Sequence, residues 1–405
     1  MPTRSLRPSS LLPVPGIRLA AVAAGIRYRD RNDLVVMELA QSSRCAAVFT
    51  RNAFCAAPVT LARAHLSRQT PRFLLINSGN ANAGTGERGL ADAASTCLTL
   101  ARRAGCEPEQ VLPFSTGVIG EPLPVERIEG RLDDALAALS EDGWADAAQA
   151  IMTTDTVAKG ISRTLDLGGQ RVVITGIAKG AGMIRPDMAT MLAYVATDAA
   201  VEAGALQRCL RRAVDGSFNR ITVDGDTSTN DACVLVATGR SPAASLDDQH
   251  PELMSFCDAV AEVCRHLAQL IVRDAEGATK FVSVCVQGGR DTEECLQVAY
   301  TVAHSPLVKT ALYASDPNWG RILAAVGRAG LPDLEVNRIR IFLDDLCTVR
   351  DGGRAAGYRE EDGQRVMRQE DISIRVDLGR GQTSETVWTS DLSEQYVRIN
   401  AEYRT

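Results

Sequence analysis

A threonine preceded by a small residue stands near the end of a glycine-containing loop in the middle of the chain. The loop, Lys179–Leu192, reads KGAGMIRPDMATML, and apolar runs typical of strands lie on both sides of it, at Val172–Ile174 and Leu192–Val195. Glycine permits backbone conformations that other residues resist, so such a loop can hold Thr190 in a strained geometry. A hydroxyl held in this way can attack the carbonyl group of the preceding residue, Ala189.

That attack would shift the acyl group from nitrogen to oxygen, and water would then complete a cut between Ala189 and Thr190. The new chain would begin with Thr190, whose free α-amino group can act as the base for its own hydroxyl. An α-amino group titrates at about 7.7–8.0, which suits proton transfer near neutral pH. The alternative from the residues alone is an ordinary loop with a solvent-facing threonine, and it stays open at this point.

The length and composition of the chain limit the kinds of protein that can contain this loop. At 405 residues the chain is long enough for two or three domains. Hydrophobic residues make up 45% and charged residues 23%, as in ordinary soluble globular proteins. The net charge of -6, the absence of a basic block and an aromatic content of 4% argue against a surface for nucleic acids.

The segments that would mark secretion or a membrane are not apparent in the sequence. Two prolines and a charge interrupt the apolar part of residues 4–18, so it resembles neither a signal peptide nor a membrane span. The eleven cysteines are scattered and include no Cys-x-x-Cys pair. They are expected to be small buried hydrophobic residues in a reducing compartment, and the cytoplasm is the expected location.

Strands alternate with helices along the chain, which predicts an α/β fold. The predicted strands are 16–23, 34–38, 46–49, 73–76, 171–177, 281–286, 296–302, 338–343 and 372–378. The predicted helices are 87–103, 124–139, 201–217, 252–272 and 305–312, with one more that ends at Arg328. Asp316, which precedes Pro317, is the expected N-cap of that last helix.

Two polar segments follow predicted strands and are candidates for a reaction centre. The first, NSGNANAGTG at 77–86, can bind an anion through backbone N–H groups, or can form a tight turn in which asparagine side chains bond to their own backbone. The second contains Ser115, Thr116 and Gly117, where glycine lets another backbone come close. A hydroxyl and a backbone N–H here would suffice for an oxyanion hole, and a simple β-turn is the alternative.

Other residues have a functional and a structural interpretation side by side. Lys179, just before the loop, can bind a substrate carboxylate or can simply be a solvated lysine. Glu276, next to Gly277 at a helix–strand junction, can bind a substrate ammonium group or can lie in a solvated turn. The clustered threonines that begin at Thr153 usually cap a helix or line a strand edge. Asp224, Asp226 and Asp231 resemble a calcium loop but lack the glutamate that an EF-hand requires, so a metal site is not expected.

Four of these segments together resemble one enzyme family. The loop motif KGxGMIxPxMATML, the NSGNANA segment, the DGDTSTND segment at 224–231 and the EGATK segment at 276–280 are similar to those of the ornithine acetyltransferase family. These enzymes are the glutamate N-acetyltransferases of arginine biosynthesis, and the similarity runs from end to end of the chain. Ala275 stands where the family usually has glycine, a change that we expect to be tolerated.

The resemblance implies a layered α/β sandwich, distinct from the N-terminal nucleophile hydrolases but parallel to them in mechanism. It implies self-cleavage into an α chain, 1–189, and a β chain, 190–405, which assemble as α2β2 or larger. It also implies transfer of the acetyl group from N2-acetylornithine to glutamate by a ping-pong mechanism without a cofactor. Acetyl-CoA serves as a second donor in some members, and the motifs do not distinguish these. No partner beyond small-molecule substrates and the two chains themselves is implied.

The family's site residues correspond to particular positions here. Thr190 matches the nucleophile, and Thr116 with Gly117 matches the oxyanion hole. The chain end, which is expected to fold back into the site, supplies two further positions. The substrate-binding positions are Thr153, Lys179, Thr190, Glu276, Asn400 and Thr405.

Two other functions are kept as alternatives. One is a self-processing amidase or aminopeptidase that uses the same threonine for hydrolysis. The other is a non-catalytic member that serves in binding or assembly, although the family's site residues are all present in this sequence.

Overall fold

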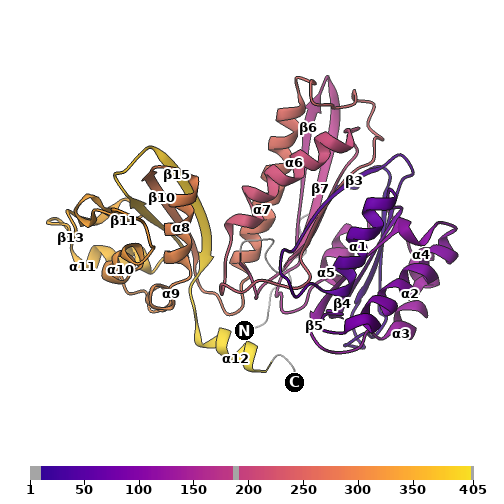
Figure 1. Cartoon of the computed structure of the whole chain (residues 1–405), viewed down its shortest axis with the longest axis horizontal. Helices are drawn as coiled ribbons and strands as arrows, with labels where there is room; N and C mark the ends of the chain where they lie inside the picture. Colours follow the sequence, from indigo (N-terminus) through magenta and orange to yellow (C-terminus); the bar gives the residue numbers. More distant parts are fainter. Residues whose placement is uncertain (1–10, 186–190, 403–405) are drawn as a thin grey trace. The chain divides into compact units, whose positions relative to one another are not determined.

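The structure is a computed structural model that describes residues 11–185 and 191–402. The chain forms two compact units. The first contains the chain up to Asn219 together with Asp226–Ile271, and the second contains Arg220–Gly225 and the chain from Val272 onward. Unit 1 has two sheets and unit 2 has one, and many of their elements are labelled in Figure 1.

The first sheet of unit 1 has four strands in the order β1-β2-β4-β5. Its strands are β1 (Ile17–Val22), β2 (Leu34–Leu39), β4 (Phe73–Asn80) and β5 (Val111–Val118). One face packs against helices α2 (Gly86–Ala104), α3 (Val125–Glu129) and α4 (Leu132–Ala137), through a cluster that includes Leu34, Leu75 and Leu100. Strands β4 and β5 are parallel, so their carboxyl ends meet at one edge.

The second sheet of unit 1 has five strands in the order β3-β9-β8-β7-β6. Its strands are β3 (Arg44–Phe49), β6 (Lys159–Leu167), β7 (Gln170–Lys179), β8 (Leu192–Thr197) and β9 (Ala232–Ala237). Helices α6 (Ala203–Asp215) and α7 (Leu253–Arg273) pack against this sheet (Figure 1). A Cβ atom on Gly176 of β7 would lie 3.0 Å from both Val263 and Leu267 of α7, so glycine lets this helix pack closely.

The two sheets of unit 1 share a core. Phe114 of β5 and Tyr194 of β8 meet edge to face with ring centroids 5.3 Å apart, and Ile177 of β7 belongs to the same cluster. Helices α1 (Ala57–Arg68) and α5 (Trp144–Ala150) contribute Ala62 and Trp144 to it. The two sheets thus pack face to face, with α1 and α5 contributing to the core between them, and this arrangement confirms the predicted layered α/β sandwich.

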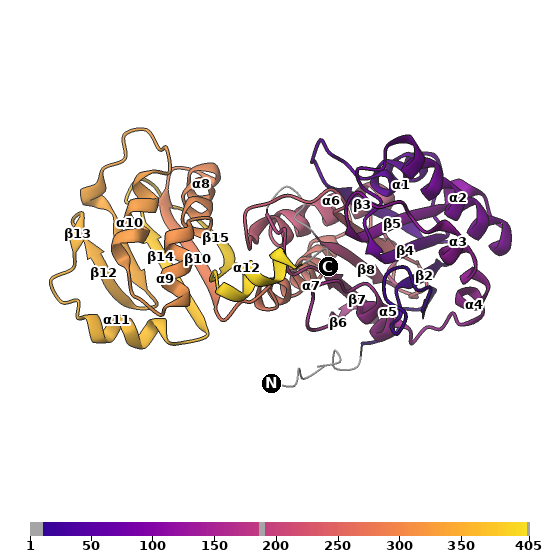
Figure 2. The same ribbon diagram turned by 90° about the horizontal axis from the view of Figure 1, so that it is seen from below.

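Unit 2 is a six-stranded sheet in the order β13-β12-β11-β14-β10-β15 (Figure 2). Its strands are β10 (Phe281–Gly289), β11 (Arg340–Leu343), β12 (Leu346–Arg350), β13 (Gly353–Arg354), β14 (Asp371–Asp377) and β15 (Thr383–Ser390). Valines 282, 284 and 286 alternate along β10 and are fully buried, as expected for a strand with one covered face.

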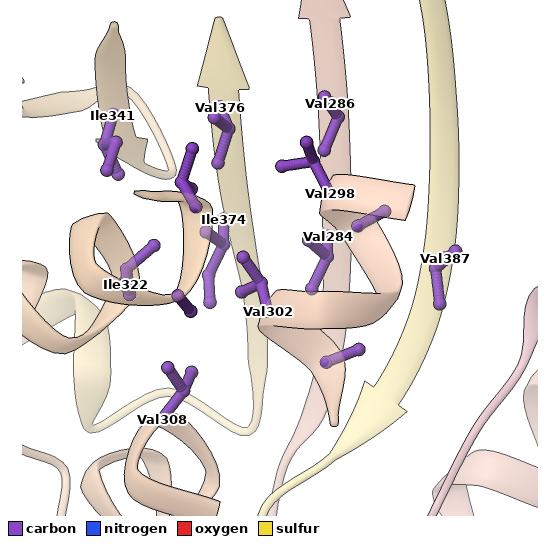
Figure 3. Packing of buried hydrophobic residues seen from close by; sticks show 14 of the residues in the cluster. Val284, Val286, Val298, Val302, Val308, Ile322, Ile341, Ile374, Val376 and Val387 are labelled. Atoms are coloured by element: carbon purple, nitrogen blue, oxygen red, sulfur yellow. The ribbon is translucent and has the colours of Figure 1, made fainter. Parts of the chain in front are cut away.

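Helices cover that face of the unit 2 sheet. They are α8 (Thr292–Ala303), α9 (Pro306–Tyr313) and α10 (Trp319–Gly327). Figure 3 shows Val298 and Val302 of α8 and Ile322 of α10 pointing toward the strand residues of this core. The remaining elements are α11 (Glu360–Met367), α12 (Glu394–Ala401) and the 3-10 turns Pro108–Gln110, Phe218–Arg220 and Val336–Arg338.

Two predicted elements were wrong. Residues 296–302 form part of helix α8 and not a strand, because the buried residues Cys295, Val298, Ala299 and Val302 follow helical spacing. The side chain of Asp291 caps this helix by accepting the Glu294 N–H. The predicted helix 124–139 is two short helices, α3 and α4, separated at Gly130.

The expected cap of α10 was also wrong. Asn318, and not Asp316, accepts the Arg321 N–H at 3.1 Å. Asp316 instead accepts a hydrogen bond from the Asn318 side chain at 3.0 Å, which orients the capping residue.

All eleven cysteines lie in the described part of the chain. Six are buried and five are partly buried, and none of them forms a disulfide. Burial raises the pKa of the Cys45 thiol to about 12, as expected for a cysteine that packs as a hydrophobic residue.

None of the helices in the described residues is both long enough and apolar enough to span a membrane.

Candidate active site

The loop with the threonine motif connects β7 to β8. These strands pair antiparallel, and Lys179 lies opposite Leu192 at their open end. Gly180 has φ +154° and Met183 has φ +57°, so the start of the loop has the unusual backbone that the sequence predicted. Ala189 and Thr190 lie outside the described residues.

Lys179 and Thr116 come together at this end of unit 1. Both side chains are buried, and the Lys179 ammonium donates a hydrogen bond to Thr116 Oγ1 at 3.1 Å. Because the lysine uses a lone pair of the hydroxyl oxygen, the threonine O–H remains a donor toward another acceptor. Burial of Lys179 excludes the alternative of a solvated surface lysine.

Position 117 requires glycine because the backbone of β4 comes very close to it. Its φ is +135°, and a Cβ atom built on it would lie 2.3 Å from the Gly79 carbonyl carbon and 2.5 Å from the Asn80 nitrogen. The expectation that glycine admits another backbone here is confirmed. Thr116 is thus held at the parallel edge of β4 and β5, beside the end of β7.

The asparagine side chains at the end of β4 and just after it form hydrogen bonds with the backbone. Asn77 Nδ2 donates to the Asn80 carbonyl oxygen at 2.8 Å, and Asn82 Nδ2 donates to the Gly89 carbonyl oxygen at 2.9 Å. Asn77 Oδ1 also accepts the Ser115 hydroxyl at 2.5 Å. Of the two interpretations of this segment, the structure supports the tight turn.

Asn230 joins the edges of the two sheets. Its Nδ2 donates to the carbonyl oxygens of Ala81, at 2.6 Å, and Ser115, at 2.9 Å. Ser115 immediately precedes Thr116, and Asn230 lies two residues before β9. One buried amide therefore fixes the oxyanion-hole candidates relative to the second sheet.

A buried carboxylate links Thr153 to the start of the loop. Asp155 accepts hydrogen bonds from the Thr153 N–H at 3.0 Å and from the Gly180 N–H at 2.7 Å. The Lys159 ammonium lies 2.7 Å from the same carboxylate, and both side chains are almost completely buried. Burial alone would raise the pKa of Asp155, but the Lys159 and Lys179 cations outweigh it and hold the pKa well below its usual value.

The second set of candidates lies in unit 2. Glu276 is buried, and its Oε2 accepts a hydrogen bond from Asn400 Nδ2 at 2.7 Å. Ala275, which replaces the family's glycine, is not among the described residues with positive φ, so alanine fits this position as expected. Thr405 lies outside the described residues.

Helix α12 is docked onto the loop that carries Glu276. Ser393 caps the helix and donates its hydroxyl proton to the Gly277 carbonyl oxygen at 2.7 Å. Tyr396 donates to Asp224 Oδ2 at 3.1 Å. Gly277 has φ +68°, and a Cβ atom there would lie 2.7 Å from the Tyr396 nitrogen. These contacts place Asn400 beside Glu276.

Lys309 is bound to the end of β15 and gives a prediction about pH. It is buried and donates to Thr389 Oγ1 at 3.0 Å and to the Ser390 carbonyl oxygen. Burial lowers its pKa from 10.5 to about 8, although Asp391 and Asp224 act in the opposite direction. Between these pH values the unfolded chain holds a proton that the folded chain has lost. The free energy of unfolding therefore rises with pH from about 8 to 10.5.

Lys309→Met should remove this rise, which amounts to about 3 kcal/mol at most. Urea unfolding at several pH values across that window would measure it. Lys280→Met is the control, because the Lys280 ammonium donates to Gln369 at the surface. Identical pH slopes for the wild type and Lys309→Met would contradict the prediction.

The structure brings some predicted residues together and leaves others untested. Thr116, Gly117 and Lys179 are grouped in unit 1, with Thr153 joined to them through Asp155. Glu276 and Asn400 are in contact in unit 2. The proposed division at residue 189 falls inside unit 1 and does not coincide with the boundary between the compact units.

Sequence reasoning did not assign Asp155, Lys159 or Asn230 to the site. The spacing of Asp155 and Lys159, four residues apart beside Thr153, is the one local signal for the first two. The sequence indicated Asn230 only as part of the DGDTSTND segment, and Asp231 only as part of that segment and of a rejected calcium loop. In the described residues, no group of three or more His, Cys, Asp or Glu side chains can hold a metal ion.

Comparison with known proteins gives matches over nearly the whole chain. The ArgJ family profile matches residues 18–405. The arginine biosynthesis bifunctional protein ArgJ of Pseudomonas fluorescens is 58% identical over 397 residues, 98% of each chain. That of Methylococcus capsulatus is 58% identical over 402 residues, covering 99% of this chain and 98% of its own.

A crystal structure of ArgJ from Bacillus halodurans is 39% identical, with a TM-score of 0.49, and covers 51% of this chain and 97% of that one. The family resemblance seen in the motifs is confirmed by the profile and by the two relatives. The chain belongs to the ArgJ family.

Proposed function

We propose that this protein is an acetyltransferase that moves the acetyl group from N2-acetyl-L-ornithine to L-glutamate in arginine biosynthesis. The observation that carries the proposal is the buried pair of Lys179 and Thr116, next to Gly117, at the base of the loop with the threonine motif. Membership of the ArgJ family supports the same activity.

The first reaction is self-cleavage. Thr190 Oγ attacks the Ala189 carbonyl carbon, the C–N bond breaks, and the threonine nitrogen takes up a proton as an ester forms. Water then hydrolyses the ester and releases the Ala189 carboxylate and the Thr190 hydroxyl. The products are an α chain, 1–189, and a β chain, 190–405, with a free α-amino group on Thr190.

Acetyl transfer then follows a ping-pong course. The Thr190 amine accepts the hydroxyl proton while Oγ attacks the acetyl carbonyl carbon of N2-acetylornithine. Thr116 O–H and Gly117 N–H donate hydrogen bonds to the developing oxyanion. The proton passes to the departing ornithine amine, and the acetyl group stays on Thr190 as an ester. The amino group of glutamate attacks that ester and leaves as N-acetylglutamate.

The charges of the amino acid substrate find two partners. Lys179 is the partner for the carboxylate, and Glu276 is the partner for the ammonium group. The hydrogen bond from Asn400 to Glu276 Oε2 fixes the carboxylate so that its other oxygen can accept a substrate N–H. Thr153, Asn400 and Thr405 are the remaining substrate-binding positions of the proposal.

The proposal also covers the cofactor requirement, the assembly and the location of the enzyme. The nucleophile is part of the chain, so no cofactor takes part, and acetyl-CoA is a possible second acetyl donor. The α and β chains assemble as α2β2 in the cytoplasm. Neither nucleic acid nor a membrane is a partner.

An intact mass spectrum of the denatured protein, beside a Thr190→Ala variant, tests the proposal. Two fragments separated between Ala189 and Thr190, absent in the variant, are expected. Incubation with N2-acetylornithine should then add one acetyl group to the β chain. An uncut 43.3 kDa chain in both samples would overturn the assignment of the nucleophile.

The same acetylated β chain separates acetyl transfer from hydrolysis. An acetyl group that persists in water and is lost on addition of glutamate is expected for a transferase. Loss at the same rate without glutamate would favour the self-processing amidase or aminopeptidase. Cleavage without any acetyl uptake would favour a non-catalytic member.

A further inference from the structure

Asp231 holds the residue that directly follows Thr190. Its Oδ1 accepts the Met191 N–H at 2.9 Å. In the other direction, the Ala232 N–H donates to the Met191 carbonyl oxygen at 3.2 Å. Met191 is therefore bound on both sides of its backbone by two consecutive residues at the start of β9.

The place of this contact is unusual within the sheet. Lys179 and Leu192 are the last paired residues of β7 and β8, so Met191 lies one step beyond the antiparallel ladder. A carboxyl oxygen takes the place of a strand partner where the hairpin opens into the loop. The amide that it binds belongs to the peptide unit formed by the Thr190 carbonyl group and the Met191 nitrogen.

The carboxyl group is also buried. Asp231 is 1% exposed, and its Oδ2 is buried without a hydrogen-bond partner among the described residues. Burial raises the pKa of Asp231 well above its usual value, against the opposing effects of the Met191 N–H, Ser228 and Lys179. A buried carboxyl group with an unpaired oxygen is costly, and the β8–β9 ladder itself does not need one.

We propose that Asp231 is a positioning residue for the nucleophile, because its carboxyl group fixes the Met191 N–H, which belongs to the peptide unit that directly follows Thr190. Asp231 does not touch the substrate and acts only through the backbone of Met191. The inference rests on the proposed function, because it concerns the nucleophile assigned there. It adds the residue that immediately precedes β9 to the part of the site in unit 1, where Thr116 lies on β5 and Lys179 on β7.

The chain offers a matched control at the other end of β8. Asp198 is also buried, and its Oδ1 accepts the Val173 N–H at 2.8 Å. Burial raises its pKa as well. Strand β8 has six residues, so the two carboxyl groups are separated by about 20 Å along it. Asp198 therefore makes the same kind of hydrogen bond, from a buried carboxyl group to a backbone N–H, but far from the loop.

The test compares Asp231→Ala, Asp231→Asn and Asp198→Ala with the wild type. Self-cleavage is followed by mass spectrometry over time from synthesis of the uncut precursor, and kcat and KM are measured for N2-acetylornithine. Asp231→Ala should slow cleavage and lower kcat by about 10- to 100-fold with little change in KM, because a small misplacement of the nucleophile has effects of this size. Asp231→Asn should restore most of both rates, because the amide oxygen still accepts the Met191 N–H.

Asp198→Ala should be cleaved at the wild-type rate, even where it lowers the unfolding midpoint. Wild-type cleavage in Asp231→Ala would overturn the inference, as would equal loss of cleavage in Asp231→Ala and Asp198→Ala. An Asp231→Asn variant that folds but is as slow as Asp231→Ala would overturn it too, since it would require a carboxyl proton or charge. If the wild type itself is not cleaved at Thr190, the proposed function fails first and the inference fails with it.

Discussion

Replacing Gly117 by alanine should lower kcat/KM by about 100- to 1,000-fold, the effect expected when an oxyanion-hole donor is lost. The new Cβ atom would lie 2.3 Å from the Gly79 carbonyl carbon and 2.6 Å from its oxygen. These are backbone atoms that cannot rotate away, so β4 and β5 must separate. Thr116 would move with β5, and its 3.1 Å hydrogen bond with Lys179 would break. Self-cleavage should slow for the same reason.

Gly105→Ala is the control for this prediction. Gly105 also has positive φ, at +67°, but a Cβ atom there would meet nothing within 4 Å. It should cost about 1 kcal/mol of stability from backbone strain and leave kcat/KM unchanged. Steady-state kinetics of both purified variants would test the prediction. A near-wild-type kcat/KM for Gly117→Ala would contradict it, because β4 and β5 would then accommodate the new methyl group without loss of the oxyanion hole.

Replacing Asp155 by asparagine should lower the free energy of unfolding by about 3–5 kcal/mol at neutral pH. The substitution leaves the buried Lys159 ammonium without its carboxylate, and it removes the nearby countercharge for Lys179. The folded-state pKa of Asp155 is depressed, so its contribution is present above the unfolded pKa of about 3.9 and is lost as the pH falls below it. The difference between wild type and variant should therefore narrow in acid.

Urea unfolding at pH 7 and at pH 3 measures both parts of this prediction. Asp362→Asn provides the comparison, because Asp362 pairs with Arg359 and Arg365 at the surface and exposed ion pairs contribute little. A loss of stability that is equally small for both variants would indicate that Lys159 finds another partner or loses its proton.

Local patterns predicted the regular elements best. The strand predicted at 34–38 and the helix predicted at 252–272 each match the structure within one residue at either end, because their apolar residues follow one period throughout. The prediction for residues 296–302 was wrong because a short apolar run fits both the helical and the strand period. Only the packing against the rest of unit 2 decides which residues are buried. Strand β15, with the sequence TSETVWTS, has little apolar content and is held by its ladder with β10.

The site could be predicted only where a motif resembled a known family. Lys179 and Thr116 are 63 residues apart, and no local pattern predicts that they meet. Asp155 and Asp231 are carboxylates in polar segments that read as turns, and their burial depends on how two sheets pack. What the sequence does predict in physical terms is the unusual backbone at the start of the loop, since glycine at 180 permits the positive φ found there.

The strand order β3-β9-β8-β7-β6 has a consequence for a chain cut before β8. Strands β8 and β9 would belong to one fragment, and both of their neighbours, β7 and β3, would belong to the other. Main-chain hydrogen bonds on two sides would then hold the pieces together, so they should not separate without melting the sheet. The intact precursor closes this sheet within one molecule, whereas denatured fragments must first find each other, so their recovery should depend on concentration. Folding of the precursor is thus a first-order reaction, whereas refolding of the two fragments is second order. The mature fold would therefore form while the two fragments are still covalently linked.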